Sequence, residues 1–269
     1  MTTSNSTSTT TTTLDIRRPS AHVAEVWLNR PEVRNAFNDG VIAELTAAFA
    51  GFAQDADLRA VVLAGHGKAF CAGADLSWMR AMASYSWQDN QADAARLAQM
   101  LWTIYQCPVP VVGRIHGDCY AGGVGLAAVC DVLVVAESAH FCLSEAKLGL
   151  LPATIGPYVV KALGEQASRR YFTTAERFSA AQAQALGFVH EVSTAEALDS
   201  TVAGIVAAIT ANGPAAVKAC KRLVQDLAGR PIDAALRDDT ARRIADIRAS
   251  DEGRAGVQSF LGKTDPPWR

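Results

Sequence analysis

The chain has 269 residues, of which 49% are hydrophobic, and its formal net charge at pH 7 is −2. A chain of this length can bury roughly 70–75% of its unfolded surface, so it needs neither disulfides nor a structural metal for stability. The near-neutral charge argues against a general nucleic-acid-binding surface. We therefore expect one large α/β domain with a helical C-terminal appendage.

The first thirteen residues, MTTSNSTSTTTTT, are Ser/Thr-rich and lack the apolar core and basic segment of a signal peptide. This composition predicts disorder over residues 1–13. None of the six cysteines forms a CxxC pair and the five histidines are scattered, which favours buried free thiols and no metal site. The most apolar stretch, 119–136, is interrupted by two glycines and Asp131, so we expect a cytoplasmic protein without a membrane span.

The first half of the chain alternates between strand and helix patterns. Helical spacing of apolar residues after Asn38 or Asp39 predicts a capped helix, and a glycine turn at 69–76 opens toward a second helix. The other predicted elements are strands at 24–29 and 58–64, an irregular or broken helix at 79–90 and an amphipathic helix at 92–106. This order predicts an α/β fold with right-handed crossovers, whose ligands bind at the carboxyl ends of the strands.

A second glycine turn lies in the most informative stretch of the chain, 109–151. The β-branched run 109–115 predicts a strand, and Tyr120-Ala121-Gly122-Gly123 leads from it into a short buried helix at 124–130. Such a turn presents free backbone N–H groups at the positive end of a helix dipole, which suits an oxyanion. Strands are expected at 132–136 and 140–143, and Glu145 follows the second of them. An acid beside an oxyanion hole is the predicted chemical centre.

The remaining chain is mostly helical. Ser179 caps a helix at 180–186 that Gly187 ends, and an extended segment at 188–192 follows. The other predicted helices cover 158–163, 168–173, 195–211, 215–227, 232–248 and 251–261. We expect a core over residues 14–193 and a C-terminal helical region over 194–269, which either covers the site or forms an oligomer interface.

Several segments together resemble one known family. They are LNRPEVRNAF (28–37), GKAFCAGADL (67–76), HGDCYAGGVGLAAVCD (116–131), FCLSEAKLGLLP (141–152), RFSAAQAQALGFVHEV (177–192) and SDEGRAGVQSFLGK (250–263). In order and spacing they are similar to the enoyl-CoA hydratase/isomerase (crotonase) superfamily, over about residues 20–263. The resemblance implies a spiral ββα core, a C-terminal helical trimerisation region, and assembly as trimers or dimers of trimers. It also implies acyl-CoA thioester substrates, with coenzyme A as part of the substrate and no separate cofactor.

The resemblance further assigns roles to residues of this chain. The backbone N–H groups of Ala74 and Gly122 would hold the thioester oxygen, and Glu145 would be the acid/base, with a pKa raised by burial. The groove for coenzyme A and substrate would be lined by Asn35, Ala36, Ala72, Asp75, Leu76 and Gly123, with Arg34 near phosphate, and Phe260 and Lys263 would contact the adenine end. A surface ion pair for Arg34 and simple helix packing for Phe260 are the alternatives.

One position departs from the family pattern. Two-glutamate hydratases carry their first glutamate where this chain has Gly125. Hydration would then depend on Glu145 alone, whereas a double-bond isomerase needs only one base. The segments AGGVGLAAVCD, FCLSEAKLGLLPA and RRYFTTAERF more nearly resemble bacterial methylglutaconyl-CoA hydratases of leucine breakdown. Asp118 is a possible substitute acid or a solvated turn residue.

We therefore expect an enoyl-CoA hydratase, with an enoyl-CoA isomerase as the alternative. An RNA-binding or scaffold role is a third reading, which the neutral charge disfavours. Serine-protease chemistry is disfavoured because no Ser-His-Asp set occurs at these motifs. The segments 78–87 and 152–157 are expected to form the far wall of the acyl pocket.

Overall fold

The computed structural model describes residues 7–269, whose strands form two sheets. The larger sheet has the order β1-β2-β3-β4-β6-β8-β11, and the smaller one has the order β10-β9-β7-β5. The strands of the larger sheet are β1 Thr7–Thr10, β2 Leu14–Ser20, β3 Val23–Leu28, β4 Ala60–Gly65, β6 Val111–Ile115, β8 Val132–Ala136 and β11 Glu191–Ser193. Those of the smaller sheet are β5 Ala69–Cys71, β7 Asp118–Tyr120, β9 His140–Cys142 and β10 Arg177–Ser179.

The helices alternate with these strands in the first half and then continue without them. They are α1 Asp39–Phe52, α2 Leu76–Met82, α3 Trp87–Tyr105, α4 Gly122–Ala128, α5 Gly156–Leu163, α6 Glu165–Thr174, α7 Ala180–Ala185, α8 Leu198–Thr210, α9 Pro214–Leu227, α10 Ala234–Ala249 and α11 Asp251–Gly262. Two short 3-10 helices, η1 Pro31–Val33 and η2 Glu145–Leu148, complete the list. The α/β prediction is confirmed.

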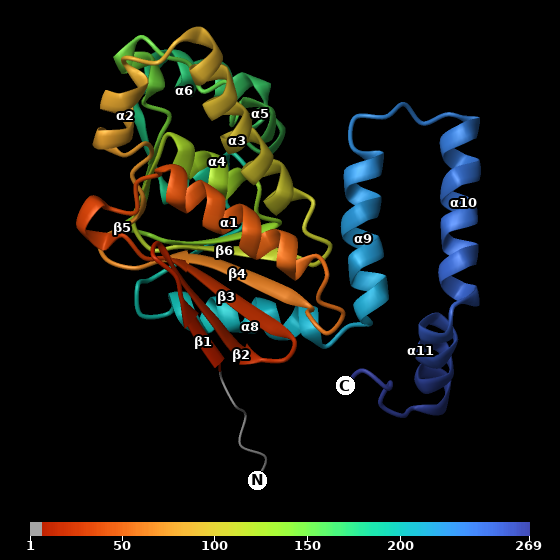
Figure 1. Ribbon diagram of the computed structural model, residues 1–269. Helices are drawn as coiled ribbons and strands as arrows, with labels where there is room; N and C mark the ends of the chain where they lie inside the picture. Colours follow the sequence, from red (N-terminus) through yellow and green to blue (C-terminus); the bar gives the residue numbers. More distant parts are fainter. Residues whose placement is uncertain (1–6) are drawn as a thin grey trace.

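The larger sheet is covered on both faces. Figure 1 shows α1 and α3 over one face and α8 against the other. β3, β4, β6, β8 and β11 pair in parallel, and the central strand β4 is buried along its whole length. Burial on both faces explains why β4 reads AVVLAG without alternating polar residues.

The smaller sheet positions the predicted site. β5, β7 and β9 are parallel, so their carboxyl ends lie at one edge. The two glycine turns follow β5 and β7 directly, and Glu145 is the third residue after β9. The segments that carry the predicted chemistry therefore leave the same edge of one sheet.

The C-terminal helices stand beside the α/β body. In Figure 1, α9 lies next to the body, α10 lies beyond it, and α11 turns back below them. Buried polar contacts fix α9, because Lys221 Nζ donates to Asp131 Oδ2 at 2.7 Å and to the Val109 carbonyl at 3.1 Å. Glu252 of α11 accepts the backbone N–H groups of Ala215 and Ala216 at 3.0 and 2.9 Å, and so caps the start of α9.

One expectation from the sequence was wrong in part. Disorder was predicted over residues 1–13, but β1 pairs antiparallel with β2, and Glu44 Oε2 accepts the backbone N–H of Thr13 at 3.0 Å. Residues 1–6 of that prediction lie outside the described part of the chain. The irregular or broken helix expected at 79–90 is broken: α2 ends at Met82, and Ser86 and Asp89 form a capping box that starts α3 at Trp87.

No single helix within residues 7–269 is long and apolar enough to cross a bilayer. The consecutive helices α8 and α9 together have sufficient length and apolar composition, but the chain bends by 105° between them. In the same residues, no group of three His, Cys, Asp or Glu side chains is arranged to hold a metal ion.

Candidate active site

The two glycine turns are in contact. Gly73 has a φ of +90°, and a Cβ placed on it would lie 2.9 Å from the Cβ of Ala121 and 3.8 Å from the backbone nitrogen of Gly122. The approach is possible because Gly73 has no side chain and tolerates a positive φ. The structure thus brings together the two turns that the sequence predicts to act as one site.

Each turn presents a free backbone N–H group. Phe37 forms a β-bridge with Ala74. The Phe37 N–H donates to the Gly73 carbonyl at 2.7 Å, and the Phe37 carbonyl accepts the N–H of Asp75 at 2.8 Å. Since N–H groups alternate along an extended chain, that of Ala74 points away from Phe37. Gly122 opens α4, where the first N–H groups have no partner within the helix. Neither N–H has an acceptor within residues 7–269, so both are available to an oxyanion.

The backbone before Gly122 is held in an unusual conformation. Ala121 has φ 46° and ψ −119°, and its N–H donates to the Cys142 carbonyl at 2.8 Å. A non-glycine residue with such a φ costs about 1–3 kcal/mol, and strain of this kind clusters at functional sites. A Cβ on Gly122 would lie 2.6 Å from Phe37 Cε2, so the packing requires glycine there.

Glu145 has the environment of a proton-transfer group. It begins η2, is half-buried, and its Oε2 atom is buried without a hydrogen-bond partner in the described chain. Burial raises the pKa of this carboxyl above its usual value, because the charged form loses hydration. A raised pKa suits a carboxyl that both takes up and gives a proton near neutral pH.

The position of the missing acid is filled by an apolar side chain. A Cβ on Gly125 would lie 2.2 Å from Ile155 Cγ2 and 2.7 Å from Ile155 Cβ. Ile155 is only 3% exposed and precedes α5, which packs on α4. A glutamate at 125 therefore does not fit unless Ile155 moves, so packing as well as sequence excludes an acid at this position.

Two residues predicted to line the groove hold the site together from within. Asn35 is buried; its amide donates to the carbonyls of His66 at 2.8 Å and Ala69 at 2.9 Å. Asp75 caps α2, and hydrogen bonds from Ser77 and Arg30 lower its pKa to about 2. Both side chains are satisfied inside the chain, so they position the backbone of the turn segment.

The other predicted groove residues surround these two. The Arg34 carbonyl accepts the N–H of Ala72 at 3.0 Å, which joins the two segments, while the Arg34 side chain is exposed. In the described chain its guanidinium makes no ion pair, so the surface ion pair considered for it is not observed. Ala36 is buried, Leu76 is 71% exposed at the start of α2, and Gly123 packs against Cys71.

Phe260 and Lys263 lie elsewhere in the single chain. Phe260 is 82% exposed on α11, which Figure 1 places beyond α9 and away from α2, α4 and α5. Lys263 is the residue that ends α11. Within one chain the structure does not bring these two residues to the glycine turns.

Asp118, the possible substitute acid, is engaged by neighbours. Its Oδ1 accepts a hydrogen bond from Arg177 Nη2 at 3.2 Å. Burial and a hydrogen bond to Asp118 raise the pKa of Tyr120 to about 12. Since side chains alternate along β7, both residues lie on the face opposite the buried Cys119. This arrangement is that of a structural ion pair.

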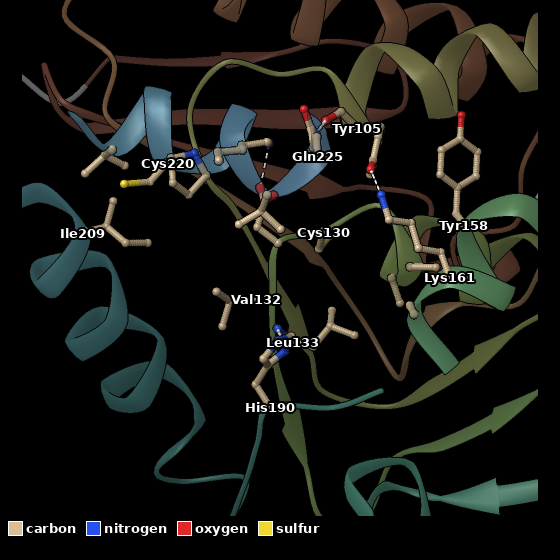
Figure 2. Close-up of a pocket in the computed structure, with 18 of the residues that line it drawn as sticks. Tyr105, Cys130, Val132, Leu133, Tyr158, Lys161, His190, Ile209, Cys220 and Gln225 are labelled. Atoms are coloured by element: carbon tan, nitrogen blue, oxygen red, sulfur yellow. Dashed lines mark hydrogen bonds and ion pairs between the residues drawn. The ribbon is translucent and has the colours of Figure 1, made fainter. Parts of the chain in front are cut away.

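A cavity of about 880 Å³ lies between α4, α5 and β8 on one side and α8 and α9 on the other. Figure 2 shows Val132, Ile209 and Cys220 around it, with Lys161 donating to the hydroxyl of Tyr105. None of the predicted site residues lines this cavity. Its size would suit a ligand, but the unpaired N–H groups and the unpaired carboxyl lie at the other end of α4.

Comparison with known proteins identifies the family. The sequence profile of the Enoyl-CoA hydratase/isomerase family matches residues 18–269, so the chain belongs to this family of enzymes, the crotonase superfamily. The crystal structure of an enoyl-CoA hydratase from Mycobacterium smegmatis superposes with a TM-score of 0.91 at 35% identity, covering 96% of this chain and 99% of that one.

Two relatives of different activity are also similar. Enoyl-CoA hydratase ACTT6 of Alternaria alternata is 32% identical over 92% of this chain and 82% of its own length. The mitochondrial Delta(3,5)-Delta(2,4)-dienoyl-CoA isomerase of Mus musculus is 34% identical over 77% of this chain and 67% of its own. Hydratase and isomerase names both occur among the relatives, so similarity alone does not separate the two activities.

Several residues that shape the site were not predicted from the sequence. Phe37 packs on Gly122, Ile155 packs on Gly125, and Arg30 pairs with Asp75 at 2.8 Å. Each pair is distant in sequence, and no spacing pattern links its members. Only the N-cap role of Asp75, two residues before Ser77 at a helix start, had a local signal.

Proposed function

We propose that the protein adds water to a 2-enoyl-CoA thioester, with Glu145 as the single acid/base. One observation carries the proposal. The segment with Glu145, whose buried Oε2 atom has no partner in residues 7–269, follows the same sheet edge as the N–H groups of Ala74 and Gly122, which also have none there. The reaction requires that negative charge on the thioester oxygen be stabilised and that a proton be transferred to a nearby carbon. The two N–H groups can do the first, and the Glu145 carboxyl can do the second.

The proposed cycle uses these groups in one sequence. The thioester oxygen accepts hydrogen bonds from the N–H groups of Ala74 and Gly122. These hydrogen bonds polarise the conjugated enoyl thioester and draw electron density from C3. The Glu145 carboxylate takes a proton from water as its oxygen bonds to C3, and negative charge collects on the thioester oxygen. The Glu145 carboxyl then returns the proton to C2 and regenerates the carboxylate. Addition is syn because one group acts on both carbons.

Gly125 favours a second candidate, an enoyl-CoA double-bond isomerase. Ile155 fills the place of a second acid, and moving a proton between C2 and C4 needs only one base. The oxyanion hole and Glu145 would serve this reaction unchanged. The two candidates differ in one observable, the incorporation of a solvent oxygen into the product.

The test measures the conversion of crotonyl-CoA and 3-methylglutaconyl-CoA in H₂¹⁸O by the wild type and by Glu145→Gln. Glu191→Gln, the same change at an exposed glutamate, is the control. For the hydratase we expect ¹⁸O in a 3-hydroxyacyl product, lost by about 10²–10⁴-fold in Glu145→Gln alone. Absence of label, with conversion of 3-enoyl-CoA substrates by the wild type, would replace the hydratase by the isomerase.

A branched, carboxylated acyl group is the substrate class that we propose within this function. The support is the sequence of residues 121–131, 141–153 and 169–178, which resembles that of methylglutaconyl-CoA hydratases. Faster turnover of 3-methylglutaconyl-CoA than of crotonyl-CoA in the same assay is the expected result. Equal or slower turnover would remove this assignment and leave the hydratase proposal intact.

We also propose that the chain assembles as a trimer or a dimer of trimers. The C-terminal helices support this, because Val224, Val257, Phe260 and Leu261 are apolar and exposed on them. Contact with a second subunit would cover these side chains and bring Phe260 and Lys263 near a neighbouring site. Sedimentation equilibrium at several protein concentrations tests it, and a monomer at every concentration would refute it.

A further inference from the structure

The indole N–H of Trp78 has no partner in the described chain. Trp78 is only 8% exposed, and its Nε1 atom is buried without a hydrogen bond. A buried donor left unpaired is costly, and native proteins pair nearly all such groups. Phenylalanine would fill apolar space here without that cost, so the N–H group itself needs an explanation.

The position of Trp78 places it beside the oxyanion turn. It is the third residue of α2, which begins directly after Ala74 and the N-cap residue Asp75. Side chains of a helix lean toward its N-terminus, so the Trp78 side chain is directed back toward the end of α2 that follows Ala74. Arg30 and Ser77 hold Asp75 at this end of α2, with bonds of 2.8 Å from Arg30 Nη2 and from the Ser77 N–H.

The ring packs in the main apolar core of the α/β body, which also contains Phe37 and Ile155. Phe37 and Ile155 lie against Gly122 and Gly125 in α4. Trp78 follows Ala74 by four residues, so its unpaired donor lies in the first turn of the helix that leaves the oxyanion turn.

We propose that the indole N–H of Trp78 donates a hydrogen bond to an oxygen atom carried on the acyl chain of the substrate. Trp78 is then a specificity-determining residue that selects oxygenated enoyl-CoA thioesters over alkyl ones. This inference rests on the proposed function, in which the N–H groups of Ala74 and Gly122 already hold the thioester oxygen. A carboxylate and a hydroxyl group are two sources of the same acceptor.

The kinetic test uses pairs of substrates with matched shape. Glutaconyl-CoA is paired with 5-methylhex-2-enoyl-CoA, and 5-hydroxypent-2-enoyl-CoA with hex-2-enoyl-CoA. The selectivity is the ratio of kcat/KM within a pair. Trp78→Phe is expected to lower this ratio by about 10-fold to 100-fold for a carboxylate, or by a few-fold for a hydroxyl. Trp102→Phe, the same change at a half-exposed indole on α3, keeps the ratio of the wild type.

A structural role for Trp78 predicts a different result. Trp78→Phe would then lower kcat/KM equally for both members of each pair, or change neither, and the ratio would stay constant. Either outcome overturns the inference, as does a wild-type preference for the alkyl member of both pairs.

A binding measurement separates this inference from the proposed function. Indole ¹H–¹⁵N spectra of the wild type are recorded with glutaryl-CoA, 5-hydroxypentanoyl-CoA and 5-methylhexanoyl-CoA, which have no double bond to hydrate. The peak missing in Trp78→Phe is expected to move downfield with an oxygenated analogue and not with the alkyl one. If no enoyl-CoA is turned over but the peak moves, the hydratase proposal fails alone. If the peak responds equally to all three, the Trp78 assignment fails.

Discussion

Replacing Gly125 by alanine tests the packing that excludes a second acid. The new Cβ would lie 2.2 Å from Ile155 Cγ2, well inside van der Waals contact. Overpacking a buried site of this kind costs about 1–3 kcal/mol. Gly→Ala within a helix otherwise adds about 1 kcal/mol of stability through helix propensity. The cost of the clash must therefore be measured against the same Gly→Ala change at a helical glycine whose added Cβ meets open space.

Gly204 supplies that control. It lies within α8, and a Cβ there would meet nothing within 4 Å. We expect Gly204→Ala to raise the free energy of unfolding and Gly125→Ala to fall below it by about 1–3 kcal/mol. Urea unfolding at one fixed protein concentration measures both, because association would shift the apparent stability with concentration.

A double-mutant cycle identifies Ile155 as the cause. Ile155→Ala alone should cost about 2–5 kcal/mol, since the side chain is buried. Adding Gly125→Ala to that variant should cost much less than in the wild type, with a coupling of about 0.5–3 kcal/mol. Additive losses, or a Gly125→Ala variant as stable as Gly204→Ala, would refute the argument that Ile155 occupies the place of the acid.

Three further changes probe the site and its support. Gly122→Ala should lower kcat by about 10²–10³-fold, because its Cβ meets Phe37 and shifts the N–H donor; Gly51→Ala, with open space, should not. Glu145→Gln should gain stability relative to the wild type as pH rises from 4.5 through the folded-state pKa, measured by thermal unfolding; a constant difference would contradict the raised pKa. Glu252→Gln should weaken the cap on Ala215 and Ala216 by about 0.5–2 kcal/mol and speed hydrogen exchange at the start of α9; unchanged exchange would contradict the cap.

The sequence predicted the elements whose signal is local. Local signals predicted the buried run of β4, the capping of α7 by Ser179 and a cap at Asn38 or Asp39, of which the structure shows Asn38. Each depends on neighbours within a few residues. The three-residue strand β7 was not predicted, because a run so short has no detectable period. The start of α3 was missed although Ser86 and Asp89 carry the capping-box pattern.

The site was predictable to the level of its reacting groups. Gly122 and Glu145 are marked by motifs, and the structure brings their segments to one edge of the small sheet. The residues that decide what these groups can do are distant in sequence from them. Ile155 follows Gly125 by thirty positions, and its role depends on how α5 packs on α4. Packing of this kind is a property of the folded chain and has no periodic signature.

The raised pKa of Glu145 also shows what the fold gives up for function. The folded state binds the Glu145 proton more tightly than the unfolded state, so folding stability falls as pH rises above 4.5 and levels off above the folded-state pKa. A partner for Oε2 would restore that stability and would also hold the carboxylate in its charged form. An acid that must both accept and return a proton cannot be held in one form. The Oε2 atom of Glu145 and the N–H groups of Ala74 and Gly122, all without partners in residues 7–269, therefore lie with the strained Ala121 at one edge of the small sheet. The paired strands β5, β7 and β9 hold these unfavourable groups in place.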